Sequence, residues 1–425
     1  MIDHPRLAAA DRNPGPPRLL VVGPALDRSS YSRVLHGTLG PLARAWDIRH
    51  LGINYDGAPV DCGWPIVPNA SPDRYAIREV VSLTRSFAPD AIFILNSFFC
   101  LPRYWRLPEL LGPRRPLLVA HCPVLGEAND PRLVARLAFF DMVVVLSDGV
   151  RRHLAECFDE CLHDGFIDRV PRLEVIPHGF DAALFHPVDR REARVACGLP
   201  PEAFVVLNAN RNERRKRVDL TLEGFARFAG DQRDVLLYLH MEESREGQRI
   251  RDLAYRFGIA GRVILDDRHL DDRELNLLYN ACDVGLNTAS SEGWGMVSFE
   301  HAATGAAQIV SGSWVTGEIW RDHAELLDAA ESQAPRTGIT REVIVSVDSV
   351  ADSLERLDGD ADHRREMARR GASFARREKF QWTSIAARWD ELLRRNLEVG
   401  AVTRFRSPTS RTRRPAARAR SATAP

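Results

Sequence analysis

The sequence predicts an α/β protein with two doubly wound domains, each built on a parallel sheet. Short segments that are apolar at almost every position recur along the chain, among them RLLVVGP at 18–24 and AFVVLNAN at 203–210. Continuous rather than alternating apolar residues are typical of parallel strands that are buried on both faces. Amphipathic segments lie between them, and alternating strands and helices imply parallel pairing through right-handed crossovers.

The expected strands fall into two series. The first comprises 18–24, 90–97, 116–123 and 142–148, and the second comprises 203–210, 234–241, 262–267, 283–289 and 306–312. Helices are expected between them, for example at 73–87, 217–230 and 247–259, with one long helix at 360–396 near the end. The segment 175–200 is rich in proline, glycine and turn residues, so we expect the hinge there, between an N-terminal domain at 18–186 and a C-terminal domain at 187–373.

The composition is that of a soluble globular protein. The chain has 425 residues, of which 44% are hydrophobic and 27% charged, and no stretch is long and apolar enough to span a bilayer. Residues 1–17 lack the features of a signal peptide and are expected to be a disordered lead-in. The seven cysteines are an odd number, which argues against a disulfide framework. We expect a cytoplasmic location, with association at the inner membrane face as an alternative.

The last residues, 397–425, are predicted to be a basic, disordered tail. From residue 401 onward this segment holds seven arginines and no acidic residue, although the formal net charge of the whole chain is zero. Such a tail is a candidate for weak contact with an anionic surface, either nucleic acid or lipid. A solvated tail without a partner is the interpretation that composition favours.

One cluster of histidine and cysteine has the spacing of metal ligands. His153, Cys157 and Cys161 recur every four residues in RRHLAECFDECLHDG, so a helix would place them on one face. A half-buried helix face gives the same spacing, because cysteine behaves as a small apolar residue. We favour the buried face and predict no metal.

A dense group of cations follows the first strand of the second series. The stretch NANRNERRKRVDL at 208–220 has a single acid, Glu213, before Asp219, and carries five cations: Arg211, Arg214, Arg215, Lys216 and Arg217. Ligands of open parallel sheets bind beyond the carboxyl ends of the strands, which for two facing sheets means the cleft between domains. Cations beside the free amides of a helix start suit a phosphate group there.

A second candidate stretch, SSEGWGMVSFEHAATG at 290–305, reads as a loop that opens a helix. Gly293 and Gly295 let the backbone approach a ligand closely, and the first amides of the helix can donate to an anion. Glu292 precedes the helix and Glu300 lies about two turns inside it. A carboxylate accepts two hydrogen bonds, which suits a vicinal diol such as that of a ribose.

These stretches, taken together and in order, resemble the retaining glycosyltransferases of the GT-B fold, in the large family 4. SSEGWGMVSFE resembles the E-x7-E motif of that family, and NRNERRK resembles its G-R-x-x-x-x-K motif. VIPHGFDAALFHP resembles its V-I-P-N-G-V-D-x-x-x-F-x-P segment, and FQWTSIAARWDELL resembles its closing helix. The resemblance covers roughly 18–396. It implies a GT-B architecture, with two Rossmann-like domains facing across a cleft and a closing helix at 374–396 that returns to the N-terminal domain.

The resemblance also implies roles for single residues. Arg211 and Lys216 would neutralise the donor diphosphate, Glu300 would hold the ribose, and Glu292 would hold the donor sugar. His121 matches a histidine that lies beside the donor sugar in the family. Further donor contacts are expected from Asn210, Gly293, Trp294, Gly295 and Met296, and the loop with Ser29, Ser30 and Tyr31 is a candidate acceptor or phosphate loop.

The implied activity is transfer of a sugar from a UDP- or GDP-linked donor to an acceptor hydroxyl, with retention of configuration and without a metal or cofactor. The acceptor would be a glycan, a lipid or a small molecule. Two alternatives stay open, a catalytically silent nucleotide-sugar-binding protein and a nucleotide-sugar epimerase of the same fold. The sequence departs from the family at Ser29, Ser30 and Tyr31, where glycines are usual, and at Asn210, which replaces a glycine.

Overall fold

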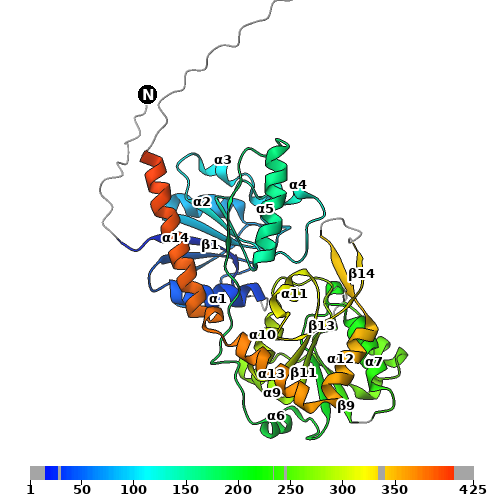
Figure 1. The fold of residues 1–425 in the computed structure, drawn as a ribbon. Helices are drawn as coiled ribbons and strands as arrows, with labels where there is room; N and C mark the ends of the chain where they lie inside the picture. The colour runs from blue at the N-terminus through cyan, green and yellow to red at the C-terminus, as the bar shows by residue number, and fades with distance from the viewer. Residues whose placement is uncertain (1–14, 27–29, 233, 244–246, 334–339, 406–425) are drawn as a thin grey trace, which may run out of the picture.

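The fold consists of two α/β domains, one above the other in Figure 1. The structure is a computed structural model, and it describes residues 15–26, 30–232, 234–243, 247–333 and 340–405. Each domain contains a sheet in which every neighbouring pair of strands is parallel, and helices cover the sheets. The predicted architecture of two doubly wound domains is therefore confirmed.

The N-terminal domain is built on a seven-stranded sheet of order β3-β2-β1-β4-β5-β6-β7. Its strands are β1 (Arg18–Pro24), β2 (Asp47–Ile53), β3 (Ile66–Pro68), β4 (Ala91–Leu95), β5 (Leu117–His121), β6 (Met142–Val145) and β7 (Arg172–Val175). Its helices are α1 (Ser30–Leu42), α2 (Ile77–Phe87), α3 (Leu107–Leu111), α4 (Pro131–Ala135) and α5 (Asp148–His163), with a short η1 (Leu101–Tyr104).

The C-terminal domain is built on a six-stranded sheet of order β10-β9-β8-β11-β12-β13. The strands are β8 (Phe204–Asn208), β9 (Val235–His240), β10 (Val263–Asp266), β11 (Val284–Asn287), β12 (Ala307–Ser311) and β13 (Glu325–Leu327). The helices are α6 (Arg190–Cys197), α7 (Val218–Ala229), α8 (Ile250–Arg256), α9 (Asp272–Ala281), α10 (Met296–Ala303), α11 (Trp314–Trp320), α12 (Val347–Gly359) and α13 (Ala361–Ala375), with short turns η2 (Arg214–Lys216) and η3 (Ala260–Arg262). An antiparallel hairpin, β14 (Ala329–Gln333) and β15 (Glu342–Val345), is added to this domain.

All nine predicted strands are present, and the strands that the sequence did not reveal lie mostly toward sheet edges. β3, β7 and β13 each end a sheet, and β2 lies next to the edge. An edge strand needs no continuous apolar run, and β7 has no fully buried residue. β2 reads DIRHLGI, and its polar His50 is fully buried although nothing in the sequence pattern indicated this.

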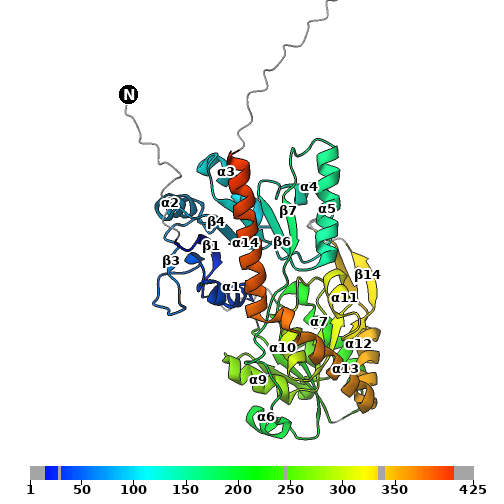
Figure 2. The same ribbon diagram turned by 60° about the vertical axis from the view of Figure 1, so that its left-hand side comes forward.

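The long helix predicted at 360–396 is wrong as a single element. Helix α13 ends at Ala375 and packs on α10 and β12 of the C-terminal domain. After the short turn η4 (Glu378–Phe380), helix α14 (Trp382–Phe405) packs against α1 of the N-terminal domain, as Figure 2 shows. The closing helix thus begins at Trp382 rather than at residue 374, and the chain crosses between domains in the break at 376–381.

Helix α14 also continues into the segment that was predicted to be disordered. Its last residue is Phe405, so the expectation of a disordered tail from residue 397 is wrong for its first nine residues. The remainder of the tail and the predicted lead-in at 1–14 lie outside the described residues. Within the described ranges, no helix combines the length and the apolar character needed to cross a membrane.

The histidine and cysteine cluster lies on α5, as its spacing predicted. Cys157 and Cys161 are buried against the domain core, and His153 Nε2 accepts a hydrogen bond of 3.0 Å from the amide of Ala128. Among the residues that the structure describes, no group of three or more His, Cys, Asp or Glu side chains is arranged to hold a metal ion. The interpretation as a buried helix face is confirmed.

A second contact joins the domains beside helix α5. The carboxylate of Glu318 on α11 accepts hydrogen bonds from the amide of Gly149, at 3.0 Å, and from the hydroxyl of Ser147, at 2.8 Å. Trp314 and Val315 of the same helix pack against the core of the N-terminal domain. The C-terminal domain therefore supplies a cap for the first turn of α5.

Candidate active site

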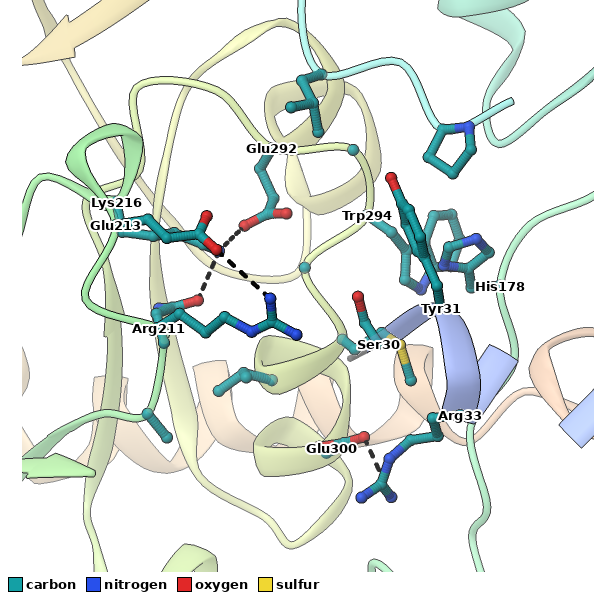
Figure 3. Close-up of a pocket in the computed structure, with 18 of the residues that line it drawn as sticks. Ser30, Tyr31, Arg33, His178, Arg211, Glu213, Lys216, Glu292, Trp294 and Glu300 are labelled. Atoms are coloured by element: carbon teal, nitrogen blue, oxygen red, sulfur yellow. Dashed lines mark hydrogen bonds and ion pairs between the residues drawn. The ribbon is translucent and has the colours of Figure 1, made fainter. Parts of the chain in front are cut away.

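A cavity of about 510 Å³ lies between the two domains, and Figure 3 shows most of its lining. The N-terminal part of the chain contributes Ser30, Tyr31, Arg33, Pro123, Leu125, Leu146 and His178. The C-terminal domain contributes Ala209, Asn210, Arg211, Glu213, Arg215, Lys216, His240, Leu275, Tyr279, Glu292, Gly293, Trp294, Gly295, Met296, Val297 and Glu300. The lining from the C-terminal domain comes mainly from the turn after β8 and from the start of α10, as the position of ligand sites at strand ends predicts.

The cationic turn after β8 forms one end of the cavity. Arg211 Nη1 lies 3.5 Å from Glu213, and Arg215 Nε lies 3.1 Å from the other oxygen of the same carboxylate. Arg215 also donates a hydrogen bond of 3.1 Å to the carbonyl of Ser291. Glu213 thus holds two guanidinium groups beside the loop that leads into α10.

Lys216 and Glu292 form a buried ion pair at this end of the cavity. The ammonium group of Lys216 donates to Glu292 and, at 2.7 Å, to the side-chain oxygen of Asn210. Burial would raise the pKa of Glu292, but the charges of Lys216 and Arg215 outweigh it and hold the pKa below its usual value. Burial lowers the pKa of Lys216, and Glu292 opposes that shift. Glu292 is therefore ionised at neutral pH.

The N-terminus of α10 faces the same space. Gly295 precedes the helix with φ of 83°, a conformation that favours glycine, and no side chain caps the helix there. The amide of Ser298 donates to the carbonyl of Gly295 at 3.0 Å, so the donors that the start of α10 can offer the cavity are the amides of Met296 and Val297. Three cations, two carboxylates and a helix N-terminus leave this end of the cavity with a net positive character, which suits an anion such as a diphosphate.

Glu300 lies at another end of the cavity and is a buried residue, 4% exposed. It accepts a hydrogen bond of 3.1 Å from the hydroxyl of Tyr279, and Arg33 Nη1 lies 3.8 Å away. Burial raises the pKa of Glu300 to about 7, although Arg33 and the hydrogen bond from Tyr279 act to lower it. An ionised Glu300 can accept hydrogen bonds from a diol.

The third part of the lining is aromatic. Trp294 stacks on Phe299, with ring centroids 4.6 Å apart and an interplanar angle of 7°, and it also contacts Phe380. Figure 3 places Trp294, Tyr31 and His178 together, across the cavity from Lys216 and Arg211. Trp294 therefore packs beneath the loop and also forms a wall of the cavity.

The structure brings nearly all of the predicted site residues together. Every predicted residue of the C-terminal domain lines the cavity, as do Ser30 and Tyr31. His121 does not: it is 1% exposed and packs against His178, with ring centroids 5.2 Å apart. Ser29 lies outside the described residues. The chemical roles of all these residues stay predictions.

Sequence reasoning missed Arg33, His178 and Tyr279 as lining residues. His178 had a signal, because it is the polar residue of VIPHG directly after the last strand of the first domain. Arg33 and Tyr279 had none, since each lies on a helix whose orientation toward the cleft depends on the tertiary fold.

Comparisons with known proteins agree with this geometry. Residues 244–394 match a family model described as glycosyl transferase-like. The D-inositol 3-phosphate glycosyltransferase 2 of Catenulispora acidiphila is 28% identical over 195 residues, which are 44% of this chain and 45% of that protein. The D-inositol 3-phosphate glycosyltransferase of Nocardia farcinica is 26% identical over 290 residues, or 66% of this chain and 60% of that protein. The chain thus spans about half the length of the curated relatives it matches.

Solved structures resemble the whole two-domain fold. Sucrose-phosphate synthase from Thermosynechococcus elongatus superimposes with a TM-score of 0.70 over 90% of this chain and all of that one, at 17% identity. Anabaena HepE in complex with UDP-glucose superimposes with a TM-score of 0.68 over 89% of this chain and 99% of that one, also at 17% identity.

Two facing parallel-sheet domains with a cleft between them define the GT-B class of proteins. The fold of this chain therefore has the GT-B architecture, and its residues 244–394 match the glycosyl transferase-like model.

Proposed function

We propose that this protein is a retaining glycosyltransferase that moves a sugar from a nucleoside-diphosphate sugar to an acceptor hydroxyl. The observation that carries the proposal is the shared cavity, in which Lys216 and Arg211 lie at one end and Glu300 at another. A nucleotide-sugar needs a site for its diphosphate and a group that accepts hydrogen bonds from its ribose diol, both within one pocket. The two ends of the cavity supply them.

The cationic end of the cavity, with Lys216 and Arg211, stabilises the leaving group during transfer. As the bond between the sugar and the leaving phosphate breaks, negative charge grows on the diphosphate. Lys216, Arg211 and the amides of α10 stabilise that charge without moving, because the pair with Glu292 and the contacts of Glu213 already fix the cations. In the retaining reaction the acceptor hydroxyl attacks from the face of the departing phosphate and gives that phosphate its proton.

UDP-sugars are the first donors to test. HepE is described in complexes with UDP and with UDP-glucose, and the superposition with this chain covers both domains. GDP-sugars are the second class. The acceptor is proposed to be a glycan, a glycolipid or a small molecule. The reaction is proposed to need no metal, because Arg211, Lys216 and the N-terminus of α10 already supply positive charge at the anion end of the cavity, where the diphosphate would bind.

The proposed site of action is the cytoplasm, with the inner membrane face as an alternative. The arginine-rich tail is proposed to make a weak, salt-dependent contact with an anionic surface. Removal of residues 406–425 should abolish retention on vesicles of anionic lipid at low salt. Unchanged retention would exclude the tail as the contact.

Thermal unfolding with UDP, GDP and ADP, each with and without an attached sugar, tests the nucleotide part of the proposal. A ligand that binds the folded state alone raises the unfolding temperature by mass action. The nucleotide that gives a shift then serves as donor in an assay of sugar release and transfer. Absence of a shift with every nucleotide would exclude the proposed function.

Variants separate a transferase from a silent binding protein. Lys216→Ala should abolish transfer, whereas Arg214→Ala in the same turn should leave it nearly unchanged, because Arg214 is exposed and does not line the cavity. A wild-type protein that binds a nucleotide-sugar without turnover would be the silent protein. Conversion of the donor sugar to its epimer would indicate the epimerase.

A further inference from the structure

The strongest unassigned feature of the cavity is the imidazole of His178. The residue is 4% exposed, yet its ring lines the cavity. Within the described part of the chain, neither Nδ1 nor Nε2 has a hydrogen-bond partner. Buried polar atoms are nearly always paired, because an unpaired one costs about 1–3 kcal/mol. A group that meets this ring from the cavity would remove that cost.

We propose that His178 is a sugar-contacting residue, which hydrogen-bonds a hydroxyl of the transferred sugar. This inference rests on the proposed function. The ring lies on the wall formed with Trp294 and Tyr31, across the cavity from the cations at the anion end, and Figure 3 shows Glu300 at a different end. In the proposed function the cations bind the diphosphate and Glu300 binds the ribose. The transferred sugar is the part of the donor left to contact the wall of His178, Trp294 and Tyr31.

The chemistry of the ring favours a hydroxyl over a phosphate. Burial lowers the pKa of His178 to about 3, so the imidazole is neutral at physiological pH. A neutral imidazole offers one N–H donor and one nitrogen acceptor, which matches a sugar hydroxyl that can both give and accept a hydrogen bond. It offers no charge to attract a diphosphate.

The packing around the ring holds it in place. One side meets His121 edge-on, with centroids 5.2 Å apart and an interplanar angle of 86°, and another side meets Trp294 at 6.1 Å. The next residue, Gly179, lies so close to Trp382 that a β-carbon there would come within 2.6 Å of the indole. The amide of Phe180 donates to the carbonyl of Phe380 at 2.9 Å. The imidazole is therefore preset before a ligand arrives.

His121 provides the matched comparison. It is also buried, and both of its ring nitrogens also lack a partner among the described residues. It does not line the cavity, although its ring centroid lies only 5.2 Å from that of His178. The two histidines thus share burial and chemistry, and they differ in that only His178 lines the cavity.

The test compares the affinity for a nucleoside diphosphate with the affinity for the same nucleotide carrying its sugar, by calorimetry on the full chain. His178→Ala should weaken binding of the nucleotide-sugar about tenfold and change binding of the nucleotide less than twofold. His178→Asn, which keeps one donor and one acceptor, should restore most of the loss. His153→Asn, on α5 and outside the cavity lining, is the control and should leave the ratio of the two affinities unchanged.

The outcomes are separable. One outcome is that the wild type binds the nucleotide and the attached sugar increases the affinity equally in wild type and in His178→Ala. That outcome would overturn this inference and leave the proposed function standing. A loss in His178→Ala that is equal for the free nucleotide and the nucleotide-sugar would assign His178 a structural role and also overturn it. A rise in the KM for the acceptor with no change for the donor would place the contact on the acceptor and overturn it as well. A failure of every nucleotide to bind the wild type would remove the proposed function itself.

Discussion

Arg33 on α1 reaches across the cleft and lies 3.8 Å from the carboxylate of Glu300 on α10. The same guanidinium donates to Asp272 on α9 at 2.5 Å. One side chain of the N-terminal domain therefore links two helices of the C-terminal domain, beside the carboxylate that is predicted to bind ribose. Domain arrangement and the charge of Glu300 are coupled at this point.

The pKa of Glu300 predicts how stability depends on pH. Burial raises this pKa from 4.5 to about 7 in the folded protein. A raised pKa means that the protonated side chain favours folding below pH 4.5, and that this contribution is lost as the pH rises toward about 7. Glu300→Gln should therefore increase the free energy of unfolding above about pH 7, by up to about 3 kcal/mol, and change it little at acidic pH.

Denaturant unfolding at acidic and at alkaline pH measures this difference. Glu355→Gln on α12 is the matched control, because its side chain is exposed. The same stability gain at both pH values in Glu300→Gln would contradict the raised pKa.

Arg33→Gln should shift the pH dependence of nucleotide binding. The groups that face Glu300 are Arg33 from α1 and Tyr279 and Asp272 from α9, and only Arg33 carries a positive charge. Removal of that charge raises the pKa of Glu300 further, so the ionised form appears only at higher pH. The midpoint at which nucleotide affinity rises with pH should move upward by about one pH unit.

Calorimetric titration of the nucleotide across neutral pH gives this midpoint for wild type and variant. Arg33→Lys keeps a positive charge and should restore much of the wild-type profile. A uniform loss of affinity at all pH values, without a shifted midpoint, would mean that Arg33 contacts the ligand or the fold and does not act through Glu300.

The sequence predicted the two-domain architecture and most of the cavity lining that comes from the C-terminal domain, and the reason is local. The cationic turn around Arg211 and the start of α10 are short continuous segments, each directly after an apolar strand, so their place at the carboxyl ends of strands followed from the pattern alone. Arg33 and Tyr279 reach the site through helices whose orientation depends on the tertiary fold, and no short segment of sequence encodes that relationship.

His121 shows the same dependence on tertiary packing: it does not line the cavity, and its predicted role stays a prediction. The residue ends β5 and so lies at the correct edge of its sheet, as predicted. The ring of His178, from the segment after β7, packs edge-on against it with centroids 5.2 Å apart, and His178 lines the cavity. The sequence pattern shows at which edge of the sheet a strand ends. Whether the residue at that end reaches the cavity depends on how the neighbouring loops pack.

Breaking the pair of Lys216 and Glu292 should affect stability and activity differently. Lys216→Met leaves a buried carboxylate without its main partner and should lower the free energy of unfolding by about 3–5 kcal/mol. The double variant with Glu292→Gln buries no unpaired charge and should recover most of that loss. Sugar transfer should stay at least about a hundredfold below wild type in both, because the cation that faces the diphosphate is absent.

Chemical denaturation and a donor-turnover assay on the same preparations separate these effects. Recovery of both stability and activity in the double variant would show that the lysine only balances the glutamate. That result would move the charge-stabilising role to Arg211 and Arg215.

Glu318 should stabilise the contact between the two domains. Its carboxylate accepts from the amide of Gly149 and the hydroxyl of Ser147, and a β-carbon on Gly149 would lie 2.4 Å from it. Glu318→Ala removes a cap from α5 and should lower the free energy of unfolding by about 1–2 kcal/mol. Gly149→Ala should push the carboxylate away and give a similar loss.

Because this contact joins α11 to α5, its loss should also favour more open domain arrangements. Small-angle scattering of the ligand-free protein should then give a larger radius of gyration for Glu318→Ala than for wild type, and nucleotide-sugar should reverse the difference. Glu318→Gln, which keeps one acceptor oxygen, should fall between the two. An unchanged radius together with lower stability would restrict Glu318 to capping α5, with no part in domain closure.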